Sequence, residues 1–459
     1  MSINGLFSRG YHRDEENNEP KAVIPIHLDA QQETAVLSNE PDIIVVAGAG
    51  SGKTRVLTER VKRLISSGIK PHNIVAITFT NLAAEEMRER LGDVEGIGDA
   101  FIGTIHSFAN KIMQLSGIDY TLYNDDVDNQ FHEELIGKYC SSLTFAKYTK
   151  YKDLQAFVEI GKVSDRELEN FFVPSERAEF NKLHRSIQEV EDERNLSTFP
   201  ESIATLCRDR NVITFDELLV KADEYFRSLD ARIEHLLVDE FQDVGTLEFH
   251  FFEALNAENN FFVGDDYQAI YGFKGGNVNL FLTIVEDSDF VRYYLTNNYR
   301  NSEEILTLAN TVISQVFGKI EKTIVPKVNE HGTVKISSKR NLYSDALKVI
   351  KDSGDYREWF ILTRTNKELF LMASECERAG IPYVTFKREG LTLRELNAYM
   401  KSNKVKILTV HTSKGLEAEN VVLYGNFPVY CPSYRNSEEE RKVMYVGVTR
   451  AKKNLIILN

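Results

Sequence analysis

The fold of this chain is decided by the stretch PDIIVVAGAGSGKTRVLTERVKRLISS, residues 41–67. It begins with a short apolar run that is typical of a buried strand, passes through a glycine-rich turn, and continues with the apolar spacing of a helix. A strand, a glycine turn and a helix in this order open an α/β domain and form a phosphate-binding loop. The sequence therefore predicts an α/β protein that binds phosphate groups.

The glycine turn has a specific chemistry. Its backbone N–H groups and those of the helix N-terminus would cradle phosphates, with Lys53 on the β- and γ-phosphates and Thr54 on Mg²⁺. The strict pattern has glycine where this chain has Ala47, which is a small departure. The residues that would form the loop are Ala47, Gly48, Ala49, Gly50, Ser51, Gly52, Lys53 and Thr54.

Further strands and helices follow on both sides of a long insertion. We expect a strand at 73–79, a helix at 81–91, and strands at 235–240 and 260–265 that end in acidic residues. Residues 111–209 are acid-rich and mostly helical in pattern, without glycine turns, which indicates a helical insertion. A second α/β unit has expected strands at 359–364, 404–410, 420–425 and 454–458.

Length and composition limit the class of protein. A chain of 459 residues suits two or three domains. No apolar run is long enough to cross a bilayer, and the polar residues 1–21 lack a signal-peptide core, so we expect a flexible tail on a cytoplasmic protein. The four cysteines stand far apart, which argues against zinc, an iron–sulfur cluster or a disulfide framework.

The net charge of −14 does not favour a nucleic-acid partner, because phosphate binding depends on Lys and Arg. From Lys401 onward, however, the sequence contains ten Lys and Arg but only five Glu and no Asp. We therefore expect a local basic track on an otherwise acidic protein.

The segment LLVDEFQD, residues 236–243, narrows the class of phosphate-binding protein to which the chain could belong. A phosphate loop alone could belong to a kinase, a GTPase or a transporter ATPase. Here Asp239 and Glu240 follow the three apolar residues 236–238, so one carboxylate would join the Mg²⁺ shell and its neighbour would polarise the attacking water. Phosphoryl transfer also needs positive charge at the γ-phosphate, for which Arg300 and Arg450 of the second α/β unit are the candidates.

Taken in order, these segments resemble the UvrD/Rep (PcrA-like) family of superfamily 1A DNA helicases. The resemblance runs from Leu28 to the last strand. It is carried by LDAQQETAV (28–36), AGAGSGKT (47–54), TFTNLAAEEM (78–87), GTIHSF (103–108), VDEFQD (238–243), VGDDYQAIYGFKGG (263–276), NYRNS (298–302), HTSKGLEAENVV (411–422) and EEERKVMYVGVTRAKKNL (438–455).

The resemblance implies a fold and an ATP site. It implies two RecA-like domains with parallel sheets, 1A at 22–110 and 210–295 and 2A at 296–459, with a helical subdomain 1B at 111–209. Gln32 would read the adenine edge and Tyr299 would stack on the ring. Further implied contacts are the γ-phosphate sensor Gln268, the arginine fingers Arg300 and Arg450, Glu417 at the ribose or triphosphate, and Arg55 directly after the loop.

A motor that tolerates any sequence needs aromatic faces for stacking rather than readers of base edges. The resemblance implies that bases of single-stranded DNA contact Phe79, Tyr271 and Phe273. The DNA phosphates or sugars would contact Thr80, Asn81, Thr104, His106 and His411. Relatives usually carry Trp and Arg where this chain has Phe273 and Lys274, and Lys where it has Leu82. The smaller ring and the point charge predict a weaker grip per base.

The large relatives also contain a subdomain called 2B, which grips duplex DNA. Between Tyr299 and His411 only about 110 residues are present, and most of them are needed for 2A. We therefore expect 2B to be absent or reduced to one short helix, with a partner protein or nuclease supplying duplex contacts.

The function expected from the sequence is ATP-dependent movement along single-stranded DNA, 3′→5′ by resemblance, by a monomer. The pathway could be DNA repair, replication, recombination or phage and antiphage DNA processing. One alternative is a translocase that strips proteins from DNA with little unwinding. Another is an ATP-gated DNA-binding scaffold, and RNA is an open alternative to DNA.

Overall fold

The structure is a computed structural model that describes residues 28–124, 126–128, 130–131, 134, 199–229, 231–272, 275–337, 343–386, 391–425, 427 and 437–458. The chain divides into two compact units. One comprises Met1–Ile112 and Ala222–Asn459, and the other comprises Met113–Lys221. The predicted tail at 1–21 lies outside the described residues.

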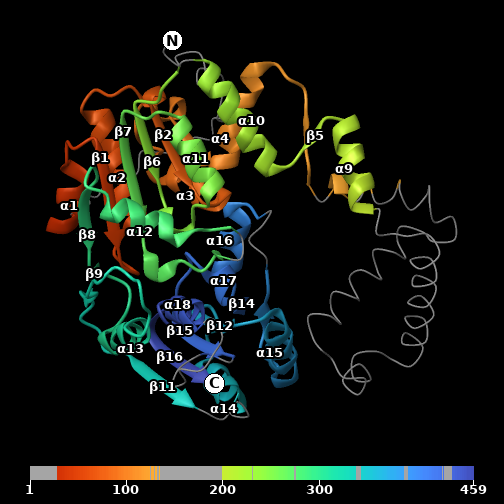
Figure 1. Cartoon of the computed structure of the whole chain (residues 1–459). Coiled ribbons are helices and arrows are strands. Elements are labelled where there is room, and N and C mark those ends of the chain that lie inside the picture. The colour runs from red at the N-terminus through yellow and green to blue at the C-terminus, as the bar shows by residue number, and fades with distance from the viewer. Residues whose placement is uncertain are drawn as a thin grey trace. The chain divides into compact units, whose positions relative to one another are not determined.

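The first sheet of the larger unit has six parallel strands in the order β3-β2-β6-β7-β1-β8 (Figure 1). A parallel sheet with both faces covered requires apolar residues in consecutive positions, and strand β1, which lies between β7 and β8, is buried from its second residue onward. The strands are β1 Asp42–Ala47, β2 Ile74–Thr78, β3 Phe101–Thr104, β6 His235–Val238, β7 Asn259–Gly264 and β8 Val291–Leu295.

Helices bury both faces of this sheet. On one face, Ile43, Val45 and Ala47 belong to a core shared with the helices α1 (Ala30–Leu37), α2 (Lys53–Ser66) and α3 (Asn81–Leu91). On the other face, Phe262 stacks on Phe241 with ring centroids 4.3 Å apart. The remaining helices are α4 Ile105–Ser116, α10 Phe215–Ser228, α11 Thr246–Ala254 and α12 Val278–Glu286.

The second sheet also has six parallel strands, in the order β11-β16-β15-β12-β14-β13. They are β11 Thr333–Ser337, β12 Trp359–Thr363, β13 Tyr383–Val384, β14 Val405–Thr409, β15 Ala418–Tyr424 and β16 Ala451–Leu458. The helices are α13 Glu303–Ile313, α14 Tyr343–Ser353, α15 Asn366–Ala379, α16 Leu393–Lys401, α17 Val410–Ser413 and α18 Ser437–Val448. The short strands β9 (Asn297–Asn298) and β10 (Val325–Pro326) pair separately. The predicted α/β fold with parallel sheets is confirmed.

The smaller unit is described only in part. Its strands β4 (Thr121–Leu122) and β5 (Val212–Ile213) pair in parallel, and the helix α9 (Phe199–Asp209) precedes β5. Arg210 lies over the Phe131 ring at 5.3 Å and pairs with Glu134 at 2.5 Å. Most of the predicted helical insertion at 111–209 lies outside the described residues.

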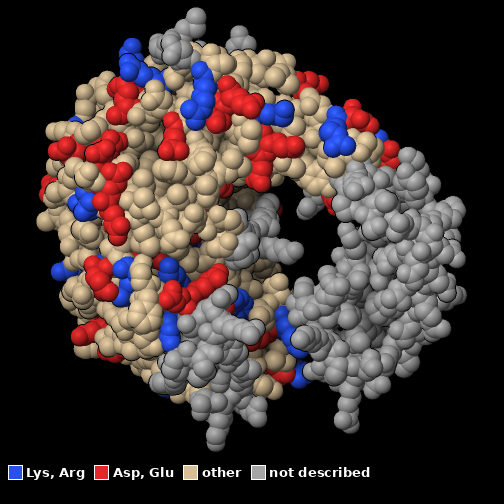
Figure 2. Space-filling model, viewed as in Figure 1, with Lys and Arg blue, Asp and Glu red and all other residues tan. Residues whose placement is uncertain are grey.

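The expected basic track from Lys401 onward is present only in part. Lys406, Lys414, Arg441 and Arg450 are buried, whereas Lys401, Lys404 and Lys453 are exposed. Lys406, for example, donates to the backbone carbonyls of Arg357 and Ser402 at 2.7 and 3.0 Å. The four buried cations therefore do not contribute to a basic surface. On the face drawn in Figure 2, Lys and Arg are interspersed with Asp and Glu.

Within the described residues, no helix combines the length and the apolar character that crossing a lipid bilayer requires.

Candidate functional site

The phosphate loop connects β1 to α2, as predicted. Gly50 and Gly52 have φ values of 65° and 85°, which favour glycine, and Gly52 is the residue before α2. A Cβ atom at Gly50 would lie 2.8 Å from the Arg300 Cβ, and one at Gly52 would lie 2.8 Å from the Gln32 Nε2. The two glycines therefore permit a close approach to residues that come from elsewhere in the chain.

Two carboxylates follow β6 and face the loop. The Lys53 Nζ donates to the Glu240 Oε2 at 3.0 Å, and the Thr54 hydroxyl donates to the Asp239 Oδ2 at 3.3 Å. Burial, and then the charge of Glu240, raises the pKa of Asp239 to about 6. Burial also acts to raise the pKa of Glu240, but the charges of Lys53 and Lys414 outweigh it and hold that pKa at about 2.

Glu240 also has an unusual backbone. Its φ is 52°, in the left-handed region that a residue with a Cβ rarely adopts. Among the described residues with positive φ, the others are glycines and asparagines, which tolerate this conformation better. Such strain gathers at functional sites, so the backbone singles out Glu240 independently of its charge.

A cavity of about 670 Å³ lies over the loop and is lined from both sheets. This volume is in the range of small-molecule sites. The first sheet contributes the phosphate loop, Asp239, Glu240 and Gln268. The second contributes Arg300, Glu417 and Arg450. The structure thus brings together all the predicted catalytic residues.

The two arginines differ in their surroundings. The Arg300 Nε donates to the Glu417 Oε2 at 2.5 Å, and Lys452 lies 3.0 Å from the other oxygen of that carboxylate. Arg450 is buried. It donates to the carbonyl oxygens of Val446 and Leu416 at 3.0 and 3.2 Å, and to the Gln268 Oε1 at 3.2 Å. Burial and the neighbouring charge of Arg300 lower the pKa of Arg450 to about 9.

The predicted adenine contacts lie at the other end of the loop. Gln32 is buried, and its Nε2 donates to the backbone oxygen of Ser51 at 2.9 Å. The Tyr299 ring is 46% exposed, and its hydroxyl donates to Asp29. Arg55 lines the cavity. An exposed ring beside a buried amide is an arrangement that can hold a nucleobase.

The residues of the loop suit a nucleotide with Mg²⁺. Lysine and free helix N–H groups bind phosphate oxygens. The oxygens of Thr54 and Asp239 already lie 3.3 Å apart, and hard oxygen ligands are those that Mg²⁺ prefers.

The predicted DNA contacts are brought together only in part. Phe79 stacks on Tyr271, with ring centroids 5.0 Å apart, and is 40% exposed, so it is not a core residue. The Tyr271 hydroxyl donates to the backbone oxygen of His411 at 3.2 Å. Thr80 is the N-cap of α3, where Asn81 begins the helix.

Two further predicted DNA contacts follow the neighbouring strand β3. Thr104 ends β3 opposite Thr78 of β2, the residue before Phe79, and His106 lies in the first turn of α4. Neither residue lines the cavity over the phosphate loop. Phe273 and Lys274 lie outside the described residues.

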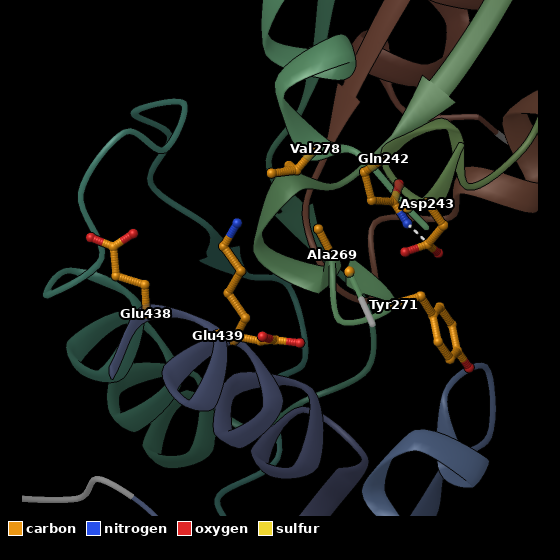
Figure 3. Close-up of a pocket in the computed structure, with 10 residues that line it drawn as sticks. Gln242, Asp243, Ala269, Tyr271, Val278, Glu438 and Glu439 are labelled. Atoms are coloured by element: carbon orange, nitrogen blue, oxygen red, sulfur yellow. Dashed lines mark hydrogen bonds between the residues drawn. The ribbon is translucent and has the colours of Figure 1, made fainter. Parts of the chain in front are cut away.

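A second cavity, of about 500 Å³, adjoins the first at Asp243 and Tyr271 (Figure 3). Figure 3 shows Gln242 and Asp243 on one side, Tyr271 below them, and Glu438 and Glu439 on the facing helix α18. The Gln242 Nε2 donates to the Asp243 Oδ2 at 3.1 Å.

Sequence reasoning missed the role of Lys414. Its Nζ donates to Asp243 and, at 2.9 Å, to the backbone oxygen of Gln268, and lies 4.9 Å from the centre of the Tyr271 ring. Lys414, which follows β14 of the second sheet, therefore bonds to two segments that follow strands of the first sheet, one at Asp243 and one at Gln268. It stands in the segment HTSKG that carries the resemblance, but its partner is 171 residues away.

Comparison with known proteins identifies two domain families. The family model of the UvrD/REP helicase N-terminal domain matches residues 28–289, and that of the UvrD-like helicase C-terminal domain matches 293–396 and 386–459. A "Probable DNA helicase" of Mycoplasma pneumoniae is 29% identical, over 94% of this chain and 83% of that protein.

Two further relatives are longer. DNA helicase II of Escherichia coli is 28% identical, over 78% of this chain and 51% of that protein. ATP-dependent DNA helicase Rep of Buchnera aphidicola is 29% identical, over 82% of this chain and 60% of that protein. The chain thus spans between half and two thirds of these two curated relatives.

Proposed function

The chain belongs to the UvrD/REP helicase family, and from this premise we propose that it hydrolyses ATP to move along single-stranded DNA. One observation carries the proposal: a single cavity is lined by the phosphate loop and Glu240 of the first sheet and by Arg300 and Arg450 of the second. Hydrolysis that needs residues from two sheets can be coupled to their relative movement.

The proposed chemistry begins with an exchange of partners at Lys53. A triphosphate would replace Glu240 as the acceptor of the Lys53 ammonium, which now lies 3.0 Å from that carboxylate. The released Glu240 would orient water and accept its proton as the oxygen attacks the γ-phosphorus. Mg²⁺, when held by Thr54 and Asp239, would neutralise charge on the phosphate oxygens.

The second sheet would complete the site. Arg450 and Arg300 would stabilise the negative charge that develops on the transferred phosphoryl group and the leaving oxygen. Gln268, which already accepts a hydrogen bond from Arg450 at 3.2 Å, would sense the γ-phosphate. Tyr271 lies three residues further on, so a movement of this short segment would couple the state of the nucleotide to the contact with DNA.

The proposed DNA track includes the exposed Phe79 and the half-buried Tyr271 and His411. Its other members are Thr80, Asn81, Thr104, His106, Phe273 and Lys274. Movement in the 3′→5′ direction and action as a monomer are proposed by analogy with the family. Residues 111–209 are proposed as subdomain 1B, and 296–459 as 2A.

We also propose that subdomain 2B is reduced to α16. The two matched segments of the C-terminal domain family overlap at 386–396, where α16 begins. This helix packs on α3, and the Leu393 N–H donates to the Glu85 Oε2 at 2.8 Å. Without 2B, the monomer would move along single strands but unwind a long duplex poorly unless a partner supplies duplex contacts.

The proposed reduction of subdomain 2B also favours a second function, the displacement of proteins from single-stranded DNA. An ATP-gated scaffold without turnover is less well supported, because Lys53, Glu240, Gln268, Arg300 and Arg450 all line the cavity or its loop.

The deciding experiment compares ATPase rates with and without single-stranded DNA, for the intact chain and for Glu240→Gln. Strong stimulation that the substitution abolishes would support the motor. Normal ATP binding with no DNA stimulation would contradict it. A parallel assay on a long duplex and on a protein-coated single strand would separate unwinding from displacement.

A further inference from the structure

A buried lysine outside every segment discussed so far lies beside Gln268. Lys322 stands between α13 and β10, and its side chain is only 1% exposed. Its Nζ lies 2.9 Å from the Asp265 Oδ1 and 2.5 Å from the Asp266 Oδ1, and both aspartate side chains are fully buried. The ammonium also lies 4.0 Å from the centre of the Tyr267 ring.

The contact continues from Asp265 toward the nucleotide cavity. The other oxygen of this carboxylate, Oδ2, accepts a hydrogen bond from the Gln268 Nε2 at 2.5 Å. The Gln268 Oε1 in turn accepts from the Arg450 Nη2 at 3.2 Å. An unbroken series of polar contacts therefore joins Lys322, Asp265, Gln268 and Arg450.

This series fixes which way the Gln268 amide faces. An ionised carboxylate only accepts hydrogen bonds, so Asp265 must receive the NH₂ end of the amide. The carbonyl end is then left for Arg450, which can only donate. With an amide at position 265 in place of the carboxylate, the Gln268 amide could turn, and its NH₂ group would oppose the guanidinium. The Lys322 ammonium, 2.9 Å from the Asp265 Oδ1, holds the carboxylate with its Oδ2 toward the Gln268 amide.

The ammonium is not needed simply to attach its own loop. The Ile320 N–H donates to the Asp266 Oδ2 at 2.9 Å, and the Tyr267 hydroxyl donates to the Ile320 carbonyl at 2.8 Å. These bonds already hold the loop against the segment 265–267. A buried charge is costly, so its presence beside Asp265 calls for a further reason.

We propose that Lys322 is a positioning residue for ATP hydrolysis, which acts through Asp265 to hold the Gln268 amide toward Arg450. The proposal rests on the proposed ATPase function. Lys322 follows α13, which packs on α18 and β16 of the second sheet, whereas Asp265 and Gln268 follow β7 of the first. The alignment of Gln268 thus depends on a contact between the two halves of the cavity.

The test measures kcat and KM for ATP with saturating single-stranded DNA in Lys322→Met, Asp265→Asn and the double variant. Lys327→Met, at an exposed lysine five residues further on, is the matched control. We expect Lys322→Met to lower kcat by about 10-fold or more with KM changed by less than about threefold, because alignment acts in the transition state. The double variant should lose no more than the more damaged of the two single variants, because both residues act in one series.

Unchanged kcat in a folded Lys322→Met, a change in KM alone, or losses that multiply in the double variant would overturn the proposal. If Lys322→Met does not fold, Lys322→Met/Asp266→Asn decides, because it removes one charge of each sign and leaves Asp265 with Gln268. The same kcat loss supports the proposal. A normal kcat, or failure to fold here too, overturns it by assigning the lysine to the fold. An inactive wild-type chain would instead contradict the proposed function.

Discussion

The two walls of the cavity over the phosphate loop hold their positive charges in different ways. On the wall of the first sheet, the Lys53 ammonium is neutralised by Glu240 at 3.0 Å. On the wall of the second sheet, Arg300 is neutralised by Glu417, whereas the described hydrogen bonds of Arg450 all go to neutral acceptors. Lys53 and Arg300 must therefore exchange a carboxylate for phosphate, but Arg450 can receive phosphate charge without losing an ion pair.

The largest effect on ATP hydrolysis should come from the wall of the first sheet, at Glu240. Glu240→Gln keeps the size of the side chain but removes its capacity to accept a proton, so we expect kcat to fall by about 10²–10⁴-fold. ATP binding should persist or tighten, since Lys53 loses its carboxylate competitor. Steady-state kinetics with a nucleotide-binding titration would check both, and a kcat within a few-fold of wild type would remove Glu240 from the reaction.

The second prediction compares the arginines of the opposite wall. Arg450→Gln should lower kcat by about 10³-fold, the lower range for loss of an arginine finger. Arg300→Gln should cost less, because Glu417 already neutralises the charge of this guanidinium. DNA-stimulated ATPase rates of the two variants, with thermal melts to confirm folding, measure this difference. Equal losses would mean that the distinction between paired and unpaired arginines has no catalytic meaning.

These predictions depend on contacts that the sequence could not supply. The phosphate loop and the strands β1, β2, β6 and β7 were predictable, because strand, turn and helix are local patterns. The pairing of Lys53 with Glu240 joins residues 187 positions apart, and only the resemblance hinted at it. Lys322 was missed because neither its burial nor its two aspartate partners leaves a local signal. The basic track is present only in part for the same reason, because a count of lysines and arginines does not reveal which of them are buried.

The third prediction concerns the aromatic cluster beside the cavity. Tyr271 has Phe79 stacked on it and the Lys414 ammonium 4.9 Å from its ring centre, so Phe79, which is 40% exposed, is the ring that can receive a base. Phe79→Ala should weaken binding of single-stranded DNA by about 1–3 kcal/mol, the usual worth of one stacked base. Fluorescence anisotropy with a labelled oligonucleotide measures it. Phe317→Ala, at an exposed ring distant from the cavity residues in sequence, is the control. Equal affinities for both variants would exclude Phe79 from the track.

The smallest effect should appear in the pH dependence of stability. Burial, and then the charge of Arg364, lowers the pKa of His411 to about 4. The unfolded chain therefore binds more protons than the folded one between about pH 6.5 and pH 4, so stability is lost as the pH falls through this range. His411→Gln should reduce that loss by about 1 kcal/mol. Urea unfolding at pH 7.5 and pH 5 tests this, and an unchanged difference would contradict it.

The hydrogen bond between α16 and α3 has a consequence for the step size of the proposed motor. The nine-residue helix α16 lies in the part of the chain that forms the second sheet. Its Leu393 N–H is nevertheless hydrogen-bonded to Glu85 of α3, a helix that covers the first sheet. If the two sheets separate during each ATP cycle, this bond either breaks or limits how far they travel. We therefore expect Glu85 to influence how many nucleotides are passed per ATP consumed, rather than how fast ATP is consumed.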